Sequence, residues 1–149
     1  MHRQALQDLL QRFSPTTEEK PHLEKIQEFV AREPQCFERS CVEGHITGSA
    51  WILNHDRSAA LLTHHRKLIM WLQPGGHADG DPNVLQVALR EGVEESGSEG
   101  LSADTGEVFD VDVHLIPARK ADPKHFHFDV RFVLVAPPEA QYVVSEASH

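Results

Sequence analysis

Apolar residues recur with a helical period twice near the start of the chain. The first stripe, which Ser14-Pro15 ends, consists of Leu6, Leu9, Leu10 and Phe13. The second follows a capping-box pattern of Thr16 with Glu19, stops at Pro34, and consists of Leu23, Ile26, Phe29 and Val30. Two helices are predicted, and their apolar faces need a partner from the same chain or from another subunit.

From residue 44 onward the pattern becomes that of strands. We predict a hairpin of residues 45–53 and 59–65 around a turn at 54–57, then an apolar run over 67–72 that leads into a Pro-Gly-Gly loop. Further strands are predicted over 108–117 and 125–135, after a polar loop over 97–106.

The strand over 125–135 alternates strictly between apolar and polar residues. Its apolar positions are Phe126, Phe128, Val130 and Phe132. Its polar positions are His125, His127, Asp129 and Arg131. Because successive strand residues point to opposite faces, one face should be core and the other a polar row.

A helix is predicted over 83–96, with Asp81 or Asn83 near its cap. It carries Glu91, Glu94 and Glu95 at spacings i, i+3 and i+4, which lie on one helix face. Like charges so placed cost a few tenths of a kcal/mol, roughly, on an isolated helix. A divalent cation with hard oxygen ligands, Mg²⁺ or Mn²⁺, would cancel this repulsion. The alternative is a solvated acidic face.

The segment from Gly76 to Ser98 resembles the signature of the Nudix hydrolases, G-x5-E-x7-R-E-U-x-E-E-x-G-U, where U is aliphatic. Six fixed positions are in register: Gly76, Arg90, Glu91, Glu94, Glu95 and Gly97. Three positions depart from the signature: Pro82 replaces its first Glu, and Gly92 and Ser98 replace aliphatic residues. Asp79 or Asp81 are the candidates to compensate for Pro82, and Gly92 inside a helix suggests close packing there.

The resemblance covers about residues 44–136 and implies an α/β/α sandwich around a mixed β-sheet. We therefore divide the chain into an N-terminal helical extension, 1–35, and a Nudix-like domain, 36–149, that is short at its C-terminus. Domains of this family usually continue with a further strand and helix. A partner subunit or the N-terminal helices would fill that gap, and we expect a homodimer.

The implied reaction is the attack of water on a pyrophosphate phosphorus of a nucleoside diphosphate derivative, with Mg²⁺ (or Mn²⁺) as cofactor. The resemblance assigns the metal to Glu91, Glu94 and Glu95. It makes Glu94 or Glu95 the candidate base, with Arg90 holding the carboxylates. The predicted substrate-binding residues are Gly75, Gly76, His77, His125, His127, Asp129 and Arg131.

Two other functions are open. The departures from the signature are compatible with a nucleotide-binding or regulatory module that has lost turnover. A histidine-rich metal protein is the second alternative, with Zn²⁺ at His125, His127 and Asp129 and with His64-His65 nearby. The base-stacking candidates, each of which is also a core candidate, are Trp51, Trp71 and Phe109.

Composition narrows the class of protein. The chain has 149 residues with 40% hydrophobic content, enough for one sizeable core. A formal charge of −9 argues against binding of a nucleic-acid polymer. No apolar run approaches the roughly 18 residues of a membrane span, and the N-terminus lacks an apolar signal core, so we expect a cytoplasmic protein. Cys36 and Cys41 would then stay reduced.

Overall fold

We describe the fold from a computed structural model. It describes residues 3–53, 60–61, 63–65, 70–72, 75–96, 100–118 and 123–137, and side chains within 3–53, 76–95, 100–118 and 123–137. The predicted turn at 54–57 and two positions of the signature, Gly97 and Ser98, lie outside the described residues.

The predicted helices are present: α1 (Gln4–Arg12), α2 (Lys20–Arg32) and α3 (Val84–Ser96). The capping box forms before α2, since the backbone amide of Glu19 donates to Thr16 Oγ1 (3.2 Å) and that of Thr16 donates to Glu19 Oε1 (2.9 Å). Asn83 caps α3, because its Oδ1 accepts the backbone N–H of Gln86 at 3.2 Å. The start signals read from the sequence are thus confirmed.

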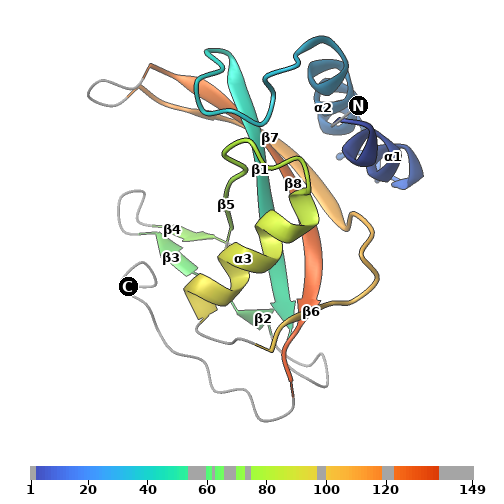
Figure 1. Cartoon of the computed structure of the whole chain (residues 1–149), viewed down its shortest axis with the longest axis vertical. Coiled ribbons are helices and arrows are strands. Elements are labelled where there is room, and N and C mark those ends of the chain that lie inside the picture. Colours follow the sequence, from blue (N-terminus) through green and yellow to red (C-terminus); the bar gives the residue numbers. More distant parts are fainter. Residues whose placement is uncertain are drawn as a thin grey trace.

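The main sheet is mixed and is built on two long central strands (Figure 1). Strand β1 (Gly44–Leu53) pairs in parallel with β8 (His125–Val135). Two short strands, β2 (Ala60–Leu61) and β5 (Gly75–His77), pair antiparallel with β1. Strands β6 (Ser102–Ala103) and β7 (Asp110–Ile116) pair antiparallel with β8. The α/β class with a mixed sheet is confirmed.

Two details differ from the sequence prediction. Within the described residues the hairpin pairs only Ile52 with Leu61 and Leu53 with Ala60, whereas β3 (Thr63–His65) pairs with β4 (Met70–Leu72) in a separate two-stranded sheet. The predicted Pro-Gly-Gly loop continues as strand β5, whose Gly76 lies opposite Gly48 of β1. Gly48 and Gly76 have no side chains, so α3 can approach β1 and β5 closely at this point. The two glycines of the Pro-Gly-Gly sequence therefore mark a sheet edge packed against a helix and not an open loop.

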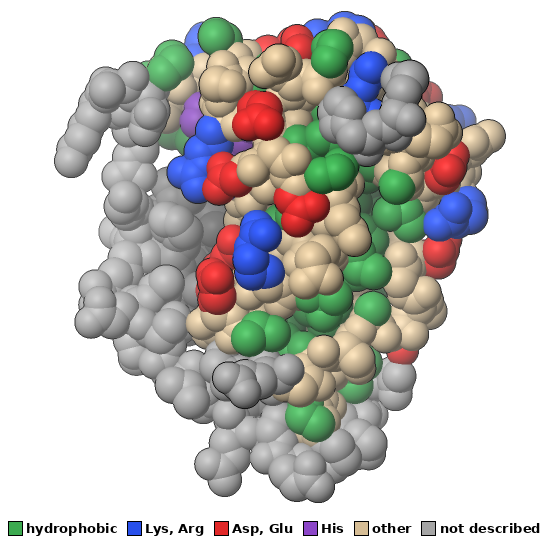
Figure 2. Space-filling view, in the orientation of Figure 1, with side chains coloured by type: hydrophobic (Ala, Val, Ile, Leu, Met, Phe, Trp, Pro, Cys, Tyr) green, Lys and Arg blue, Asp and Glu red, His purple; other side chains and the backbone are tan. Residues whose placement is uncertain are grey.

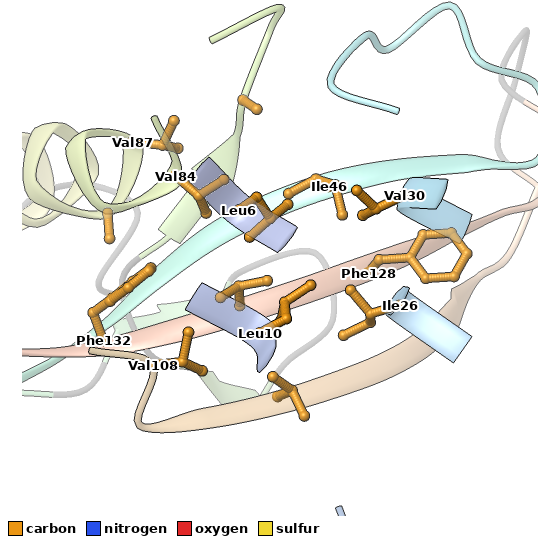
Figure 3. Close-up of a cluster of buried hydrophobic side chains, with 14 of the residues drawn as sticks. Leu6, Leu10, Ile26, Val30, Ile46, Val84, Val87, Val108, Phe128 and Phe132 are labelled. Carbon is orange, nitrogen blue, oxygen red and sulfur yellow. The ribbon is translucent and has the colours of Figure 1, made fainter. Parts of the chain in front are cut away.

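All three described helices cover the same face of the sheet. The register places Ile46 beside Phe128 and Gly48 beside Val130, so these residues share a face. The Phe29 ring of α2 stacks on Phe128, with centroids 4.0 Å apart. In Figure 3, side chains from all three helices meet this face of β1 and β8, at Leu6, Leu10, Ile26, Val30, Val84 and Val87. The apolar faces of α1 and α2 are therefore buried within the same chain.

Glycines set how closely α3 approaches the sheet. A Cβ at Gly48 would lie 2.8 Å from the Val84 carbonyl oxygen, so only glycine fits at that crossing. A Cβ at Gly92 would meet the side chains of Leu134 at 3.1 Å and Leu101 at 3.2 Å. The close packing predicted at Gly92 is present, and it accounts for the absence of an aliphatic residue there.

Candidate functional site

The Glu91 side chain lies against the backbone of Gly76. A Cβ at Gly76 would stand 2.5 Å from both Glu91 Cδ and Oε1, so a side chain there would displace the carboxylate. Gly76 is fixed in β5 by its pairing with Gly48, and Glu91 is fixed on α3. The absence of a side chain at Gly76 therefore creates the space that the carboxylate occupies between helix and sheet edge.

Arg90 connects the same two elements. Its Nη2 donates to the His77 carbonyl oxygen at 3.4 Å, and its Nη1 lies 3.8 Å from Asp81 Oδ2. Of the two acids considered as substitutes at Pro82, Asp79 is instead paired with Arg39, whose Nε donates to it at 2.7 Å. Asp81 is thus the carboxylate beside Arg90.

The three acids of α3 differ in exposure: Glu94 is exposed, while Glu91 and Glu95 are half-buried. Burial, together with the charge of Glu94, raises the pKa of Glu91 above its ordinary value. Within the described side chains, these three acids do not form a group whose ligand atoms all lie within 4.8 Å of one another. A cation between Glu91 and its neighbours would offset both the burial and the repulsion, and carboxylate oxygens are the donors that Mg²⁺ and Mn²⁺ prefer.

The outer edge of β5 presents backbone groups next to Arg90. The Ala78 amide donates to the Ile46 carbonyl at 3.4 Å, so alternation directs the amide of His77 away from β1. It points to the side on which the His77 carbonyl accepts Arg90. An anionic oxygen at this edge would meet an amide and a guanidinium together.

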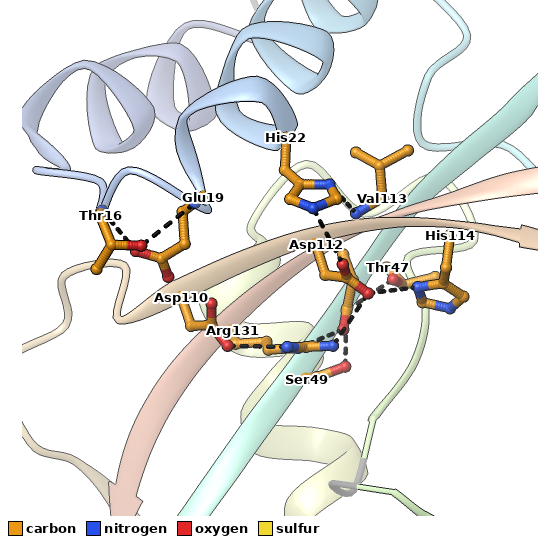
Figure 4. Close-up of polar contacts among 11 residues, drawn as sticks. Thr16, Glu19, His22, Thr47, Ser49, Asp110, Asp112, Val113, His114 and Arg131 are labelled. Carbon is orange, nitrogen blue, oxygen red and sulfur yellow. Dashed lines mark hydrogen bonds and ion pairs between the residues drawn. The ribbon is translucent and has the colours of Figure 1, made fainter.

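The predicted polar row of β8 is present, but its members have different surroundings. Asp129 is 5% exposed, and its Oδ1 accepts the hydroxyls of Thr47 at 2.8 Å and Ser49 at 2.7 Å. Arg131 Nε donates to Asp129 Oδ2 at 2.9 Å, and its Nη1 donates to Asp110 Oδ2 at 2.8 Å. Figure 4 shows Arg131 between β7 carboxylates and the hydroxyls of β1.

The charged side chains of this network pair with one another. Burial alone would lower the pKa of Arg131, but the charge of Asp129 and the bond to Asp110 hold that pKa above its ordinary value. Both carboxylate oxygens of Asp129 and all three nitrogens of the Arg131 guanidinium have partners inside the sheet, so Asp129 and Arg131 act as a structural pair in the described structure. Their prediction as substrate-binding residues gains no support from these contacts.

At the other end of the row, four imidazoles gather around that of His127. The ring centroid of His127 lies 5.1 Å from His45, 5.1 Å from His77, 5.2 Å from His125 and 5.5 Å from His114. Sequence reasoning did not single out His45 or His114 as site residues. Strand alternation predicts which face of β1 carries His45, but it does not show that His45 lies beside His127. That contact depends on the parallel pairing of β1 with β8.

The buried rings carry unsatisfied nitrogens. His45 is 4% exposed, and both of its ring nitrogens, like Nε2 of His127, have no hydrogen-bond partner within the described part of the chain. Burial, reinforced by the neighbouring imidazoles, lowers the pKa of His45 to about 4 and that of His127 to about 2. These rings are therefore neutral at pH 7. Each unmade buried hydrogen bond costs on the order of 1–3 kcal/mol, so the cluster calls for an explanation.

The carboxylates and the imidazoles occupy opposite faces of the sheet. Gly76 faces Glu91 of α3, whereas the next residue, His77, lies beside Thr47 on the other face with His45 and His127. Figure 2, viewed from the α3 side, shows acidic and basic side chains interspersed over this helix and almost no histidine surface. The chain thus has two chemically different donor sets.

Two of the three base-stacking candidates, Trp51 and Phe109, have described side chains. Phe109 is 55% exposed, and Trp51 is half-buried on β1. The side chains of Trp71, His64 and His65 lie outside the described residues.

No described helix has the length and apolarity to cross a bilayer.

Comparisons with known proteins identify the fold. No family model matches the chain, and neither does any curated protein. The E. coli dihydroneopterin triphosphate pyrophosphohydrolase structure matches at 18% identity with a TM-score of 0.50, covering 68% of this chain and 74% of that one. The C. elegans Ap4A hydrolase matches at 20% identity and TM-score 0.45, over 66% and 74% of the two chains. A NUDIX-family hydrolase from Clostridium perfringens matches at 21% identity and TM-score 0.40, over 69% and 77%.

The first of these similarities establishes the fold. The mixed sheet with its packed helices matches a Nudix-like fold. The described helices cover one face of this sheet, whereas the resemblance implied a sandwich with helices on both faces. Identity of 18% extends the similarity no further than the fold, so activity has to be argued from the residues of this chain.

Proposed function

We propose that this protein is a metal-dependent pyrophosphohydrolase acting on a nucleoside diphosphate derivative. The observation that carries the proposal is the position of Glu91, pressed against the side-chain-free backbone of Gly76 and sharing a helix face with Glu94 and Glu95. A half-buried carboxylate beside further acids is the environment that a divalent cation stabilises. The Nudix-like fold is compatible with this reaction class, to which the named activity of the E. coli structure also belongs.

In the proposed mechanism, residues of α3 bind the metal and activate water, and the backbone of β5 contacts the phosphate. Glu91, Glu94 and Glu95 would hold Mg²⁺ or Mn²⁺, which supplies charge neutralisation on the pyrophosphate and a lowered pKa for attacking water. Glu94 or Glu95 would accept the proton of that water. Arg90, bonded to the His77 carbonyl, keeps the helix and the sheet edge in register, and the outward amide of His77 would donate to a phosphate oxygen.

The test is turnover of a panel of nucleoside diphosphate derivatives by the full chain, with Mg²⁺, with Mn²⁺ and with a chelator. Release of a nucleoside monophosphate in the metal arms, and its loss with the chelator, supports the proposal. The contrary result is an absence of turnover across the panel while nucleotides still raise the melting temperature. That result identifies a binding module, the alternative that Pro82 and the exposure of Glu94 allow.

Gly76→Ala should separate the position of Glu91 from the stability of the fold. The new methyl group would meet the flexible end of Glu91, so the side chain can move aside and the melting temperature should stay within a few degrees of wild type. The displaced carboxylate should lower kcat/KM by at least about tenfold, a loss of roughly 1.4 kcal/mol in transition-state stabilisation.

Glu91→Asp provides the control for Gly76→Ala. The shorter side chain no longer reaches the space beside residue 76, so adding Gly76→Ala to Glu91→Asp should cost little further activity. Steady-state kinetics of the two single variants and the double variant measure this coupling. Fully additive losses would contradict the contact between Gly76 and Glu91 as the cause.

A further inference from the structure

Three histidines from three adjacent strands converge on one point of the polar sheet face. They are His45 of β1, His77 of β5 and His127 of β8, and their ligand atoms all lie within 4.8 Å of one another. His45 is 4% exposed, while His77 and His127 are half-buried. The group is therefore anchored in the sheet and open on one side.

Ordinary packing does not account for this group. Both ring nitrogens of His45 and Nε2 of His127 are without hydrogen-bond partners in the described structure. The two flanking imidazoles are engaged elsewhere, since His125 Nδ1 lies 3.0 Å from the Pro123 carbonyl and His114 Nδ1 lies 3.0 Å from Asp112. The unsatisfied nitrogens therefore belong to members of the three-histidine group.

Charge compensation by a nearby acid does not account for it either. Asp129, two residues from His127 on the same face, has its oxygens on Thr47, Ser49 and Arg131. Asp79, which acts electrostatically on His45 and His77, is paired with Arg39. The imidazoles face one another without a free carboxylate among the described side chains that could hold them protonated.

We infer that His45, His77 and His127 form a metal centre for one Zn²⁺ ion, with the three imidazoles as ligands and a fourth position open to water or a substrate atom. Neutral imidazoles with unshared lone pairs suit Zn²⁺, whereas Mg²⁺ selects oxygen donors. Three protein ligands with an open fourth position are typical of zinc sites that take part in chemistry, and four are typical of structural sites.

The dimensions of the group fit such an ion after small ring movements. Zn–N bonds of about 2.0–2.1 Å in a tetrahedral site place ligand nitrogens about 3.4 Å apart. The three donor atoms already lie within 4.8 Å of one another, so rotation of the imidazoles about their side-chain bonds can close the difference. The backbone positions are fixed by the ladders of β1 with β5 and β8.

The ligand atoms of this centre are distinct from those of the proposed hydrolase metal, although the backbone of His77 also belongs to the proposed phosphate-binding edge. Its ligands lie on the sheet face opposite α3, and its nitrogen donors differ in kind from the carboxylates of Glu91, Glu94 and Glu95. It also differs from the zinc alternative considered from the sequence, because His45 and His77 replace His125 and Asp129 as ligands. The inference stands whether or not the protein hydrolyses nucleotides.

The experiment is a zinc titration of the metal-stripped full chain in competition with a chromogenic chelator. Wild type should bind one Zn²⁺ per chain, and its melting temperature should rise with zinc concentration. His77→Gln and His127→Gln should each weaken binding by at least about tenfold, since each removes one of three ligands. Co²⁺ in the same site should give the strong visible absorption of a low-coordinate ion, and this absorption should be lost in both variants.

Two controls make the result specific. His125→Gln changes an imidazole of the same cluster that is outside the group, and Glu94→Gln with Glu95→Gln changes the other donor set. Both should bind zinc within about threefold of wild type. Three results would overturn the inference: wild type does not bind zinc, His77→Gln binds zinc as tightly as wild type, or the zinc affinity of His125→Gln falls as much as that of His77→Gln. Since His77 is half-buried on a short strand, its variant tests the site even if His127→Gln unfolds the chain.

Discussion

Replacing both Glu94 and Glu95 by Gln is expected to reduce kcat of the proposed hydrolysis by about 10²–10³-fold. Metal-ion catalysis is worth several kcal/mol of transition-state charge stabilisation, and about 1.4 kcal/mol corresponds to one factor of ten in rate. The amides keep the shape of the carboxylates but lose their charge, so both the metal affinity and the base are lost. The melting temperature should change little or rise, because removing negative charge next to Glu91 relieves repulsion on α3.

Steady-state kinetics over a range of Mg²⁺ concentrations measure this effect. A loss of metal affinity shows as activity that high Mg²⁺ partly restores, whereas loss of a base persists at saturating metal. Glu24→Gln is the matched control, an exposed acid on α2 away from α3, and should leave kcat unchanged. Equal activities of the double variant and wild type would contradict the assignment of these carboxylates as metal ligands.

Replacing Arg131 by Met should lower the free energy of unfolding by about 3–5 kcal/mol, because it leaves the buried carboxylate of Asp129 without its charge partner. The Arg131 side chain is 18% exposed and that of Asp129 is 7% exposed, so water cannot replace the lost guanidinium. The hydroxyls of Thr47 and Ser49 remain on Asp129, but they carry no compensating charge. Urea denaturation with an unchanged m-value measures the loss.

Arg12→Met is the control for this prediction. Arg12 makes comparable bonds to Glu107, at 2.8 and 3.1 Å, but the two side chains are 53% and 49% exposed. An exposed ion pair contributes little to stability because water and salt screen it, so this variant should be nearly as stable as wild type. Adding Asp129→Asn to Arg131→Met should restore part of the loss, because it removes the uncompensated charge. Similar stability of the two Arg→Met variants would contradict the structural role of Arg131.

Local patterns in the sequence predicted the elements that local chemistry specifies. The helical stripes, the Thr16–Glu19 capping box and the Asn83 cap act within one turn of chain, so spacing alone is enough to predict them. The alternation in β8 likewise placed Phe128, Val130 and Phe132 in the core, while Phe126 near the strand end is 38% exposed. These predictions hold because the backbone fixes which neighbours along the chain share a face.

Sheet pairing produced the differences from prediction. Gly75-Gly76 has the composition of a loop, yet its partner on β1 is also a glycine, Gly48, and α3 packs against that point. Similarly, Thr63–His65 was predicted in one strand with residues 60–61, but it pairs with β4. Strand partners are chosen by contacts between distant segments, which no local window records.

By itself the sequence determined the three helices and the acidic stripe of α3, because each depends on hydrogen bonds and side-chain spacing within one segment. The class of fold was inferred from the resemblance of residues 76–98 to a known signature. Only the tertiary structure decided that Glu91 rests on Gly76, that Arg131 is enclosed by carboxylates, and that the imidazoles of His45, His77 and His127 meet. Each of these contacts joins segments far apart in the chain. Their positions follow from the pairing of β1 with β5 and with β8, from the packing of α3 against β5, and from the burial that drives this packing.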